Sequence, residues 1–331
     1  MKRKQLIGLI VAASLFVVIC IISMITRYFL GNETYENKGL FGAMEELDKP
    51  TGNYIGIITI DGEIAAGSGS SFVSTAGYNH ERILNNIETY ESEKSNKGIM
   101  VYINSPGGSV NASDEVYLRL MEYKEKTERP VWVYMADECC SGGYYIAMAG
   151  DRLIANRNTW TGSIGVYVAL NNYKELMDKL GVKTTYIKTG ANKAMGAATE
   201  ELTEEQHDIL QGVVDEAYDQ FISVIVDNRT ELTEEKIREL ADGRIYTAKQ
   251  ALEFGLIDDI TKTYKEAEDL MIKEVGEDLE MYEIPAETSF WDEFYAGLYG
   301  MKSKSDTEML LDMMENDNSG EAMYYAMPGQ N

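Results

Sequence analysis

Histidine, cysteine and basic residues are all scarce in this chain of 331 residues. A catalytic triad or metal site built on imidazole would have to use His80 or His207, the two histidines present. Cys20, Cys139 and Cys140 are too few for a disulfide framework and lack metal-ligand spacing. Lys and Arg number 30 against 55 Asp and Glu, a formal net charge of −25 that repels phosphate backbones. We therefore expect no nucleic-acid partner, no metal and no other cofactor.

An uncharged apolar run of twenty residues, Leu6–Ile25, stands near the N-terminus. A helix of this length spans the hydrocarbon core of a bilayer. Lys2–Lys4 precede the run and Arg27 follows it, so the positive-inside rule predicts a cytoplasmic N-terminus and an extracytoplasmic remainder. A cleaved signal peptide is the alternative, but no clear small-x-small cleavage site follows the run. We therefore expect a single-pass anchor in the cytoplasmic membrane over residues 1–27, followed by a linker over 28–52.

In residues 53–275, segments with the apolar pattern of strands alternate with segments that have helical spacing. This order predicts an α/β domain with largely parallel strand pairing. The expected strands are Tyr54–Ile60, Gly98–Ile103, Val131–Met135, Arg152–Ala155, Val166–Leu170 and Thr184–Ile187. The expected helices are His80–Ser92, Ser113–Lys124, Thr203–Asn228, Thr233–Ala241 and Thr247–Phe254.

The C-terminal extension, residues 276–331, has a different composition. No basic residue follows Lys304, and six of the seventeen methionines fall between Met301 and Met327. One interpretation is a disordered or loosely helical tail. The other is a segment that folds onto a partner or into a neighbouring cleft.

Two glycine-rich turns are candidates for chemistry. Asn104–Ser109 joins a predicted strand to a helix, and its two glycines expose N–H groups that can hold an oxyanion. A phosphate is a weaker interpretation, because the Lys-Ser/Thr of a P-loop is missing. In the second turn, Ser141 precedes Gly142 and Gly143 after the strand Val131–Met135. That serine is either a nucleophile on a sharp corner or a helix cap.

A nucleophilic serine requires a base within hydrogen-bond reach. Both histidines lie in polar, surface-like surroundings. A desolvated lysine can be neutral and serve instead, and the segment Ile187–Lys193 offers Lys188 and Lys193. Surface solvation is the ordinary state of either lysine.

Five motifs together resemble the signal peptide peptidase A family of membrane-anchored serine peptidases, whose fold is shared with Clp protease and crotonase. The similarity covers about Tyr54 to Leu270. The motifs are NSPGGSV at Asn104–Val110, SGGYYIA at Ser141–Ala147, TGSIGV at Thr161–Val166, KTGANK at Lys188–Lys193 and GRIYTAKQALEFGLID at Gly243–Asp258.

The resemblance implies a Ser-Lys dyad. Ser141 matches the family nucleophile and Lys193 its general base, which leaves Lys188 a structural role. Ser163 aligns with a serine that hydrogen-bonds the base lysine. Gly108 and Gly142, with Gly107 as an alternative to Gly108, would supply the oxyanion-hole N–H groups. Cys139 and Cys140 stand where the family usually has small residues. We interpret Cys140 as a small buried hydrophobe rather than a nucleophile. A disulfide between the adjacent Cys139 and Cys140 is the alternative, and it would distort the turn that carries Ser141.

The function implied is that of an endopeptidase that degrades signal-peptide remnants and other hydrophobic or unfolded peptides at the outer face of the cytoplasmic membrane. Short family members form homo-oligomeric rings in which one subunit's serine meets its neighbour's lysine. Two alternatives remain from other classes. A catalytically inactive membrane scaffold would keep the fold, and an acyl-CoA enzyme of the crotonase type would share the oxyanion loop but use a cytoplasmic substrate.

Overall fold

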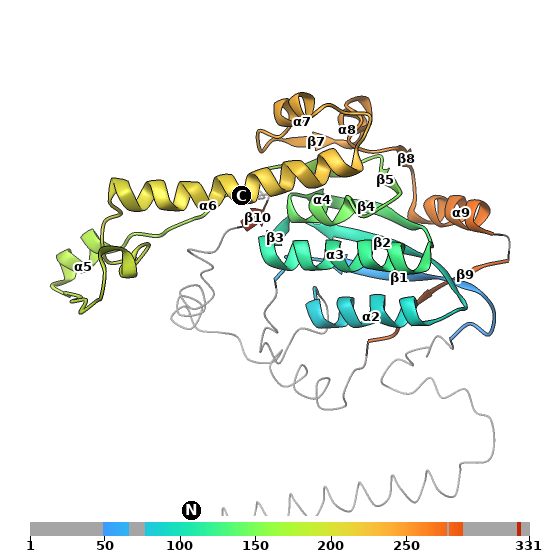
Figure 1. Ribbon diagram of the computed structural model, residues 1–331, viewed down its shortest axis with the longest axis horizontal. Helices are drawn as coiled ribbons and strands as arrows, with labels where there is room; N and C mark the ends of the chain where they lie inside the picture. The colour runs from blue at the N-terminus through green and yellow to red at the C-terminus, as the bar shows by residue number, and fades with distance from the viewer. Residues whose placement is uncertain (1–48, 66–76, 277, 287–322, 326–331) are drawn as a thin grey trace, which may run out of the picture. The chain divides into compact units, whose positions relative to one another are not determined.

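A mixed eight-stranded sheet forms the centre of the described chain (Figure 1). The computed structural model describes residues 49–65, 77–276, 278–286 and 323–325. The predicted anchor at 1–27 and all but the end of the predicted linker lie outside these residues. Within the described ranges, no helix has the length and apolarity needed to cross a bilayer.

The strand order in the sheet is β7-β6-β4-β2-β1-β9, and β5 pairs with both β4 and β8. All neighbouring strands run parallel except β6 and β7. The strands are β1 (Tyr54–Asp61), β2 (Asn96–Ser105), β4 (Val131–Cys140), β5 (Arg152–Asn156), β6 (Trp160–Gly162), β7 (Ile245–Thr247), β8 (Asp259–Thr261) and β9 (Glu280–Glu283). Residues 280–283, placed by the sequence in the C-terminal extension, thus form an edge strand beside β1.

Both faces of the sheet are covered, as expected for parallel strands that read as nearly continuous apolar runs. Along β4, Val131, Val133 and Met135 join the core beneath α2, α3 and α4, whereas Trp132 and Tyr134 pack with α9 on the opposite face. The helices are α2 (His80–Ser92), α3 (Val110–Thr127), α4 (Gly142–Ala147), α5 (Lys174–Leu180), α6 (Glu204–Asn228), α7 (Glu234–Leu240), α8 (Ala248–Glu253) and α9 (Tyr264–Val275).

Two predicted strands are wrong. Val166–Leu170 is irregular apart from an isolated bridge at Tyr167, and Thr184–Ile187 has no regular structure. A strand needs a neighbouring backbone to satisfy its N–H and C=O groups, and Thr184–Ile187 pairs with no strand among the described residues. The side chain of Ile187 is fully exposed. The intervening helix α5 was not predicted.

The long helix α6 follows the prediction closely. Thr203 caps it, and Thr203 and Gln206 exchange the two hydrogen bonds of a capping box. Figure 1 shows α5 at the N-terminal end of α6 and α4 beside its other half. Phe221 near the C-terminal end of α6 packs on Tyr145 of α4, with ring centroids 5.1 Å apart. The helix therefore connects the core to the irregular segment that precedes it.

A cluster of charges joins α2 to α3. Glu91 of α2 accepts hydrogen bonds from Arg119 and Lys126 of α3. Burial by itself would raise the pKa of Glu91, but the bonds from these two cations outweigh it and leave the pKa lowered. A carboxyl group whose pKa is lower in the folded state stabilises the fold above its unfolded pKa, and this contribution is lost as the pH falls through the folded pKa.

We predict that Glu91→Gln lowers the free energy of unfolding at neutral pH by less than about 1 kcal/mol, because the cluster is partly solvated. The loss should shrink as the pH falls between about 5 and 3, where the parent carboxylate itself is protonated. Urea unfolding across this pH range tests the prediction. Glu122→Gln, at a more exposed partner of the same cations, is the control and should change less. A difference in the free energy of unfolding between Glu91→Gln and the parent protein that stays constant from neutral to acid pH would contradict the prediction.

Candidate active site

Ser141 stands at a sharp corner between β4 and α4. Its backbone has φ 52° and ψ −114°, a conformation that residues other than glycine rarely adopt. The Ser141 N–H donates to the Gly162 carbonyl at the end of β6 (2.8 Å), which fixes the corner to the sheet. The side-chain oxygen is buried and has no hydrogen-bond partner among the described residues. A hydroxyl on a strained strand-to-helix turn is the arrangement that exposes a nucleophile to a substrate.

The second predicted element, Gly107–Ser109, forms the short strand β3. One edge of β3 is occupied by Ile64, whose N–H donates to the Gly107 carbonyl (2.8 Å) and whose carbonyl accepts from the Ser109 N–H (2.7 Å). In a trans peptide the C=O and N–H point in opposite directions. Since the Gly107 carbonyl faces Ile64, the Gly108 N–H faces the other edge of β3.

The Gly107 N–H is not available to a substrate, because it donates to the Ser105 hydroxyl (3.1 Å). Of the two glycines proposed from the sequence, the geometry therefore favours Gly108 as the oxyanion donor. A side chain at Gly108 is excluded, since its Cβ would lie 2.0 Å from the Ile64 carbonyl oxygen.

Gly108 and Gly142 lie against each other. A Cβ added to Gly142 would lie 3.2 Å from the Gly108 nitrogen and 2.5 Å from the Ser113 hydroxyl. Gly142 is the first residue of α4, and the N–H groups of a first helical turn have no partner within the helix. Gly142 and the Gly108 amide nitrogen thus lie close together beside Ser141, and an acyl-transfer oxyanion requires two backbone N–H donors of this kind.

Lys193 lies away from this corner in the same chain. It is exposed in the short 3-10 helix Ala191–Ala194, and its neighbour Asn192 is hydrogen-bonded to Gln206 in the first turn of α6. Gln220, fourteen residues further along α6, bonds Tyr145 of α4. At about 1.5 Å per residue the two contacts are roughly 21 Å apart along the helix. That separation exceeds what a four-carbon lysine side chain spans.

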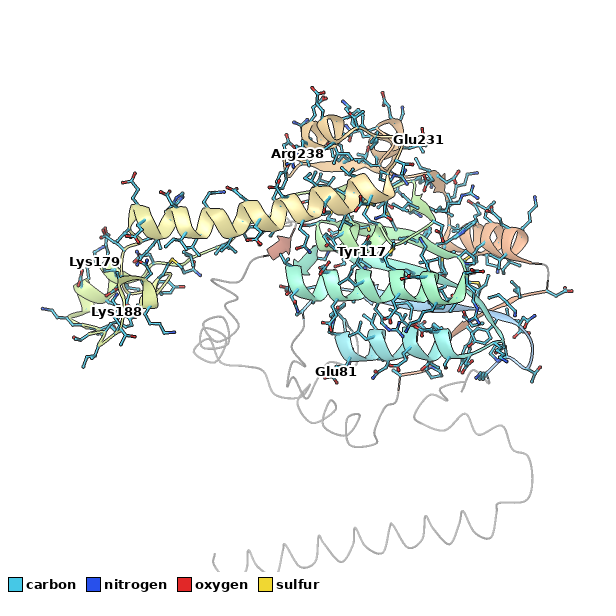
Figure 2. All side chains as sticks on the ribbon, in the orientation of Figure 1. Glu81, Tyr117, Lys179, Lys188, Glu231 and Arg238 are labelled. Carbon is cyan, nitrogen blue, oxygen red and sulfur yellow. The ribbon has the colours of Figure 1, made fainter. Side chains whose placement is uncertain are left out.

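Lys188 has a different environment from Lys193. Its ammonium group forms an ion pair with Glu200 (2.9 Å) and lies over the ring of Tyr186. Figure 2 shows Lys188 on the segment around α5, near Lys179. The Glu200 carboxylate and the Tyr186 ring thus occupy the ammonium group within its own segment. This favours the structural role expected for Lys188.

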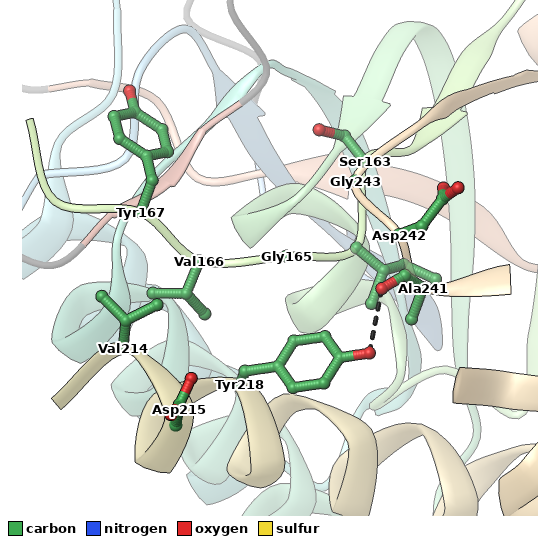
Figure 3. A pocket seen from close by; sticks show the side chains of 11 residues that line it. Ser163, Gly165, Val166, Tyr167, Val214, Asp215, Tyr218, Ala241, Asp242 and Gly243 are labelled. Atoms are coloured by element: carbon green, nitrogen blue, oxygen red, sulfur yellow. Dashed lines mark hydrogen bonds between the residues drawn. The ribbon is translucent and has the colours of Figure 1, made fainter. Parts of the chain in front are cut away.

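Ser163 follows the Gly162 carbonyl that holds Ser141. Its φ is 49°, and its N–H donates to the Arg244 carbonyl (2.8 Å). Ser163 lines a cavity of about 390 Å³ whose opposite wall is formed by Val214, Asp215 and Tyr218 of α6 (Figure 3). Tyr218 donates to the Ala241 carbonyl (2.9 Å) and closes one end of that wall. The Ser163 side chain is itself buried beside this cavity, with 7% of its surface exposed.

The two cysteines next to Ser141 are free and buried. Burial, with a smaller effect of Glu138, raises the pKa of the Cys140 thiol to about 12, so its nucleophilic thiolate form is strongly disfavoured. The Cys140 thiol donates to the Trp160 carbonyl (3.5 Å). These contacts favour the interpretation of Cys140 as a small buried side chain.

Each histidine has partners of its own in the described chain. His80 is held between the Tyr78 hydroxyl (2.6 Å) and the Glu115 carboxylate (2.9 Å) at the start of α2. His207 is exposed in the first turn of α6, beside Asp208. Their positions leave a lysine as the remaining candidate base that the sequence analysis named.

A strand from the C-terminal extension pairs with the edge of β3 that faces away from Ile64. This strand, β10 (Met323–Tyr325), pairs antiparallel with β3 and brings Tyr324 opposite Gly108. β10 also lies close to α4. A neighbouring cleft was one predicted destination of the tail, but this segment was not identified from the sequence. The uninterrupted apolar and aromatic run AMYYAM was the available signal.

Ser105 and Ile64 were also missed by the sequence analysis. Ser105 belongs to the quoted NSPGGSV motif, but only the observed turn shows that its hydroxyl holds the Gly107 amide. Ile64 contacts β3 through its backbone, which no side-chain pattern reveals.

Comparisons with known proteins match two families of peptidases. The profile of peptidase family S49 matches residues 123–276, and that of Clp protease matches residues 73–159. A protein named signal peptide peptidase SppA in Enterococcus faecium is 36% identical over 203 residues, which cover 61% of this chain and 58% of that protein. A Synechocystis protein named as a protease is 39% identical over 201 residues, covering 61% of this chain and 67% of its own.

Protease 4 of Haemophilus influenzae is 31% identical over 208 residues, 63% of this chain and 33% of that larger protein. The matched part thus spans between one third and two thirds of these relatives. The two family profiles together cover residues 73–276, which include the Ser141 corner, β3 and the segment that carries Lys193. The chain belongs to peptidase family S49, a family of serine-type peptidases, and carries a Clp protease-like α/β domain.

Proposed function

We propose that this protein is a serine endopeptidase in which Ser141 attacks the scissile carbonyl and Lys193 is the general base. The observation that carries the proposal is the proximity of three groups: the buried Ser141 hydroxyl, which has no hydrogen-bond partner among the described residues, and the amides of Gly108 and Gly142. The two N–H groups stabilise the oxyanion as the carbonyl becomes tetrahedral. Lys193 takes the Ser141 proton, returns it to the leaving amine and then activates the water that hydrolyses the acyl-enzyme.

The base comes from a second copy of the chain in this proposal. Lys193 is exposed and separated from its own Ser141 by much of the length of α6. The segment before it exposes six large apolar side chains, a density that is typical of an interaction surface. These residues are Tyr173, Leu176, Leu180, Val182, Tyr186 and Ile187. Burial against a neighbour would desolvate the Lys193 ammonium group and lower its pKa, as a base requires.

Ser163 has a supporting role. It lines the cavity between α6 and the strand end that holds Ser141. A lysine that enters from a neighbouring chain would meet this hydroxyl, which can accept a hydrogen bond from the ammonium group and orient it toward Ser141.

The substrates we propose are extended peptides, including signal-peptide remnants and other hydrophobic or unfolded segments. An extended peptide can pair, in place of β10, with the edge of β3 that faces away from Ile64. The predicted anchor Leu6–Ile25 would hold the peptidase domain at the outer face of the cytoplasmic membrane, where such peptides are released. No metal or other cofactor takes part in the proposed reaction.

We predict that Ser141→Ala and Lys193→Ala each reduce hydrolysis of a fluorogenic hydrophobic peptide by at least about a thousandfold. If the two residues act across a subunit contact, mixing the two inactive variants restores part of the activity, because some contacts then pair an intact serine with an intact lysine. Lys188→Ala is the matched control for the lysine and should retain activity. Lost activity without restoration in verified mixed assemblies would contradict the shared site. An inactive parent chain with its tail removed would favour the scaffold alternative.

The tail strand β10 occupies the edge where a substrate strand would pair. It lies opposite Gly108 and beside α4, while Ser141 is 1% exposed. We therefore propose that the tail competes with peptide substrates for β3.

We predict that a chain ending at Lys302 hydrolyses the fluorogenic peptide with a lower KM than the full chain, because substrate no longer has to displace β10. A synthetic peptide with the sequence of residues 320–331 should inhibit the shortened chain competitively. Steady-state kinetics, with oligomer size checked by light scattering, test this. Unchanged KM together with unchanged oligomer size would contradict competition by the tail.

A further inference from the structure

We propose that Ser105 is a positioning residue for acyl transfer, because its hydroxyl fixes the turn that aims the Gly108 amide at the substrate carbonyl. The proposal rests on the proposed function of Ser141 and adds a residue that touches neither substrate nor nucleophile. Three observations carry it: the hydrogen bond of Ser105, its burial, and its place between the two halves of the site.

The first observation is a local turn. Ser105 is completely buried at the end of β2, and its hydroxyl accepts the Gly107 N–H (3.1 Å) across Pro106. A serine that bonds the amide two residues ahead closes a compact turn. Since a buried N–H without a partner is costly, this bond stabilises one orientation of the Pro106–Gly107 peptide.

The second observation is that Ser105 contacts the nucleophile side as well. The pairing of β2 with β4 has an irregularity between Ile103 and Ser105, after which Ser105 lies opposite Cys139. Cys139 is two residues before Ser141. On the other side, a Cβ added to Gly143 would lie 3.2 Å from the Ser105 carbonyl oxygen and 3.6 Å from its Cβ. Ser105 therefore packs against α4 while it holds β3.

The third observation is the freedom of the segment that follows. Gly107 and Gly108 have φ values of 112° and 157°, and neither has a side chain to restrict rotation. Ile64 holds the Gly107 carbonyl from one side. Ser105 holds the Gly107 N–H from the other, so together they fix the peptide planes on both sides of the Gly107 Cα. Loss of the hydroxyl leaves the donor at Gly108 with a wider range of orientations.

Loosening the Gly108 donor should affect kcat more than KM. The oxyanion donor contributes most when charge develops on the carbonyl oxygen, so a poorly aimed donor lowers kcat more than it raises KM. Loss of a whole donor costs about a hundredfold to a thousandfold in kcat. We expect about a tenfold loss for Ser105→Ala, which loosens the Gly108 donor but does not remove it.

The test compares Ser105→Ala with two variants in the full-length protein. Ser105→Thr keeps the hydroxyl and should recover most of kcat. Thr159→Val removes another fully buried hydroxyl, which donates to the Met135 carbonyl (2.9 Å), and controls for a general loss of stability. For Ser105→Ala we expect kcat about tenfold lower with KM within about twofold. Its affinity for a peptide boronate, which forms a tetrahedral adduct on serine, should fall by about the factor lost in kcat.

Two results would overturn the role of Ser105. One is an equal loss of kcat in Ser105→Ala and Thr159→Val at equal unfolding temperature. The other is a loss of kcat in Ser105→Ala with unchanged boronate affinity. The proposed function is checked separately by the parent protein and Ser141→Ala. If the parent protein cleaves no peptide, hydrogen exchange of the segment 105–109 still reports on the turn: exchange no faster in Ser105→Ala than in the parent also overturns the proposal.

Discussion

The candidate site depends on one pair of backbone hydrogen bonds, those that Ile64 makes with β3. They use the Gly107 carbonyl and the Ser109 amide, so the intervening Gly108 amide must face the other way. A strand added at that edge of β3 therefore meets the Gly108 N–H donor beside Ser141. The contact is made by backbone atoms and needs no reactive group. It requires the backbone conformation at Ile64 and a residue without a side chain at Gly108.

The parallel sheet supplies the rest of the geometry. β2 and β4 are neighbours, so their carboxyl ends place the oxyanion turn and the Ser141 corner side by side. Parallel sheets commonly locate their sites at this edge. Ser141 is further held by the Gly162 carbonyl of β6, on the far side of β4 from β2. The Ser141 corner is thus held by three strands whose positions are determined by a core of buried apolar side chains.

Much of this arrangement could be predicted from the sequence. The helix His80–Ser92 was predicted with its observed bounds, and the strand β1 to within one residue, because both have strong periodicity. The glycine turns at 107–108 and 142–143 were predicted because a chain that turns sharply beside a helix needs residues without side chains. The segment 166–187 was mispredicted, since apolar side chains that face outward repeat with the same spacing as buried ones. In the described chain these side chains are exposed, so the pattern alone could not distinguish this surface segment from a buried strand.

The two adjacent cysteines lie in the part of β4 that leads to the corner, and neighbouring strand residues point to opposite faces. Cys139 is fully buried, and Cys140 lies against the Trp160 carbonyl on the other side. Neither thiol can meet the other, or a solvent reagent, while β4 keeps its pairing. Their modification by a thiol reagent would therefore require local opening of β4 from the strands beside it. The cysteine pair thus reports on local opening of the strand that leads to Ser141.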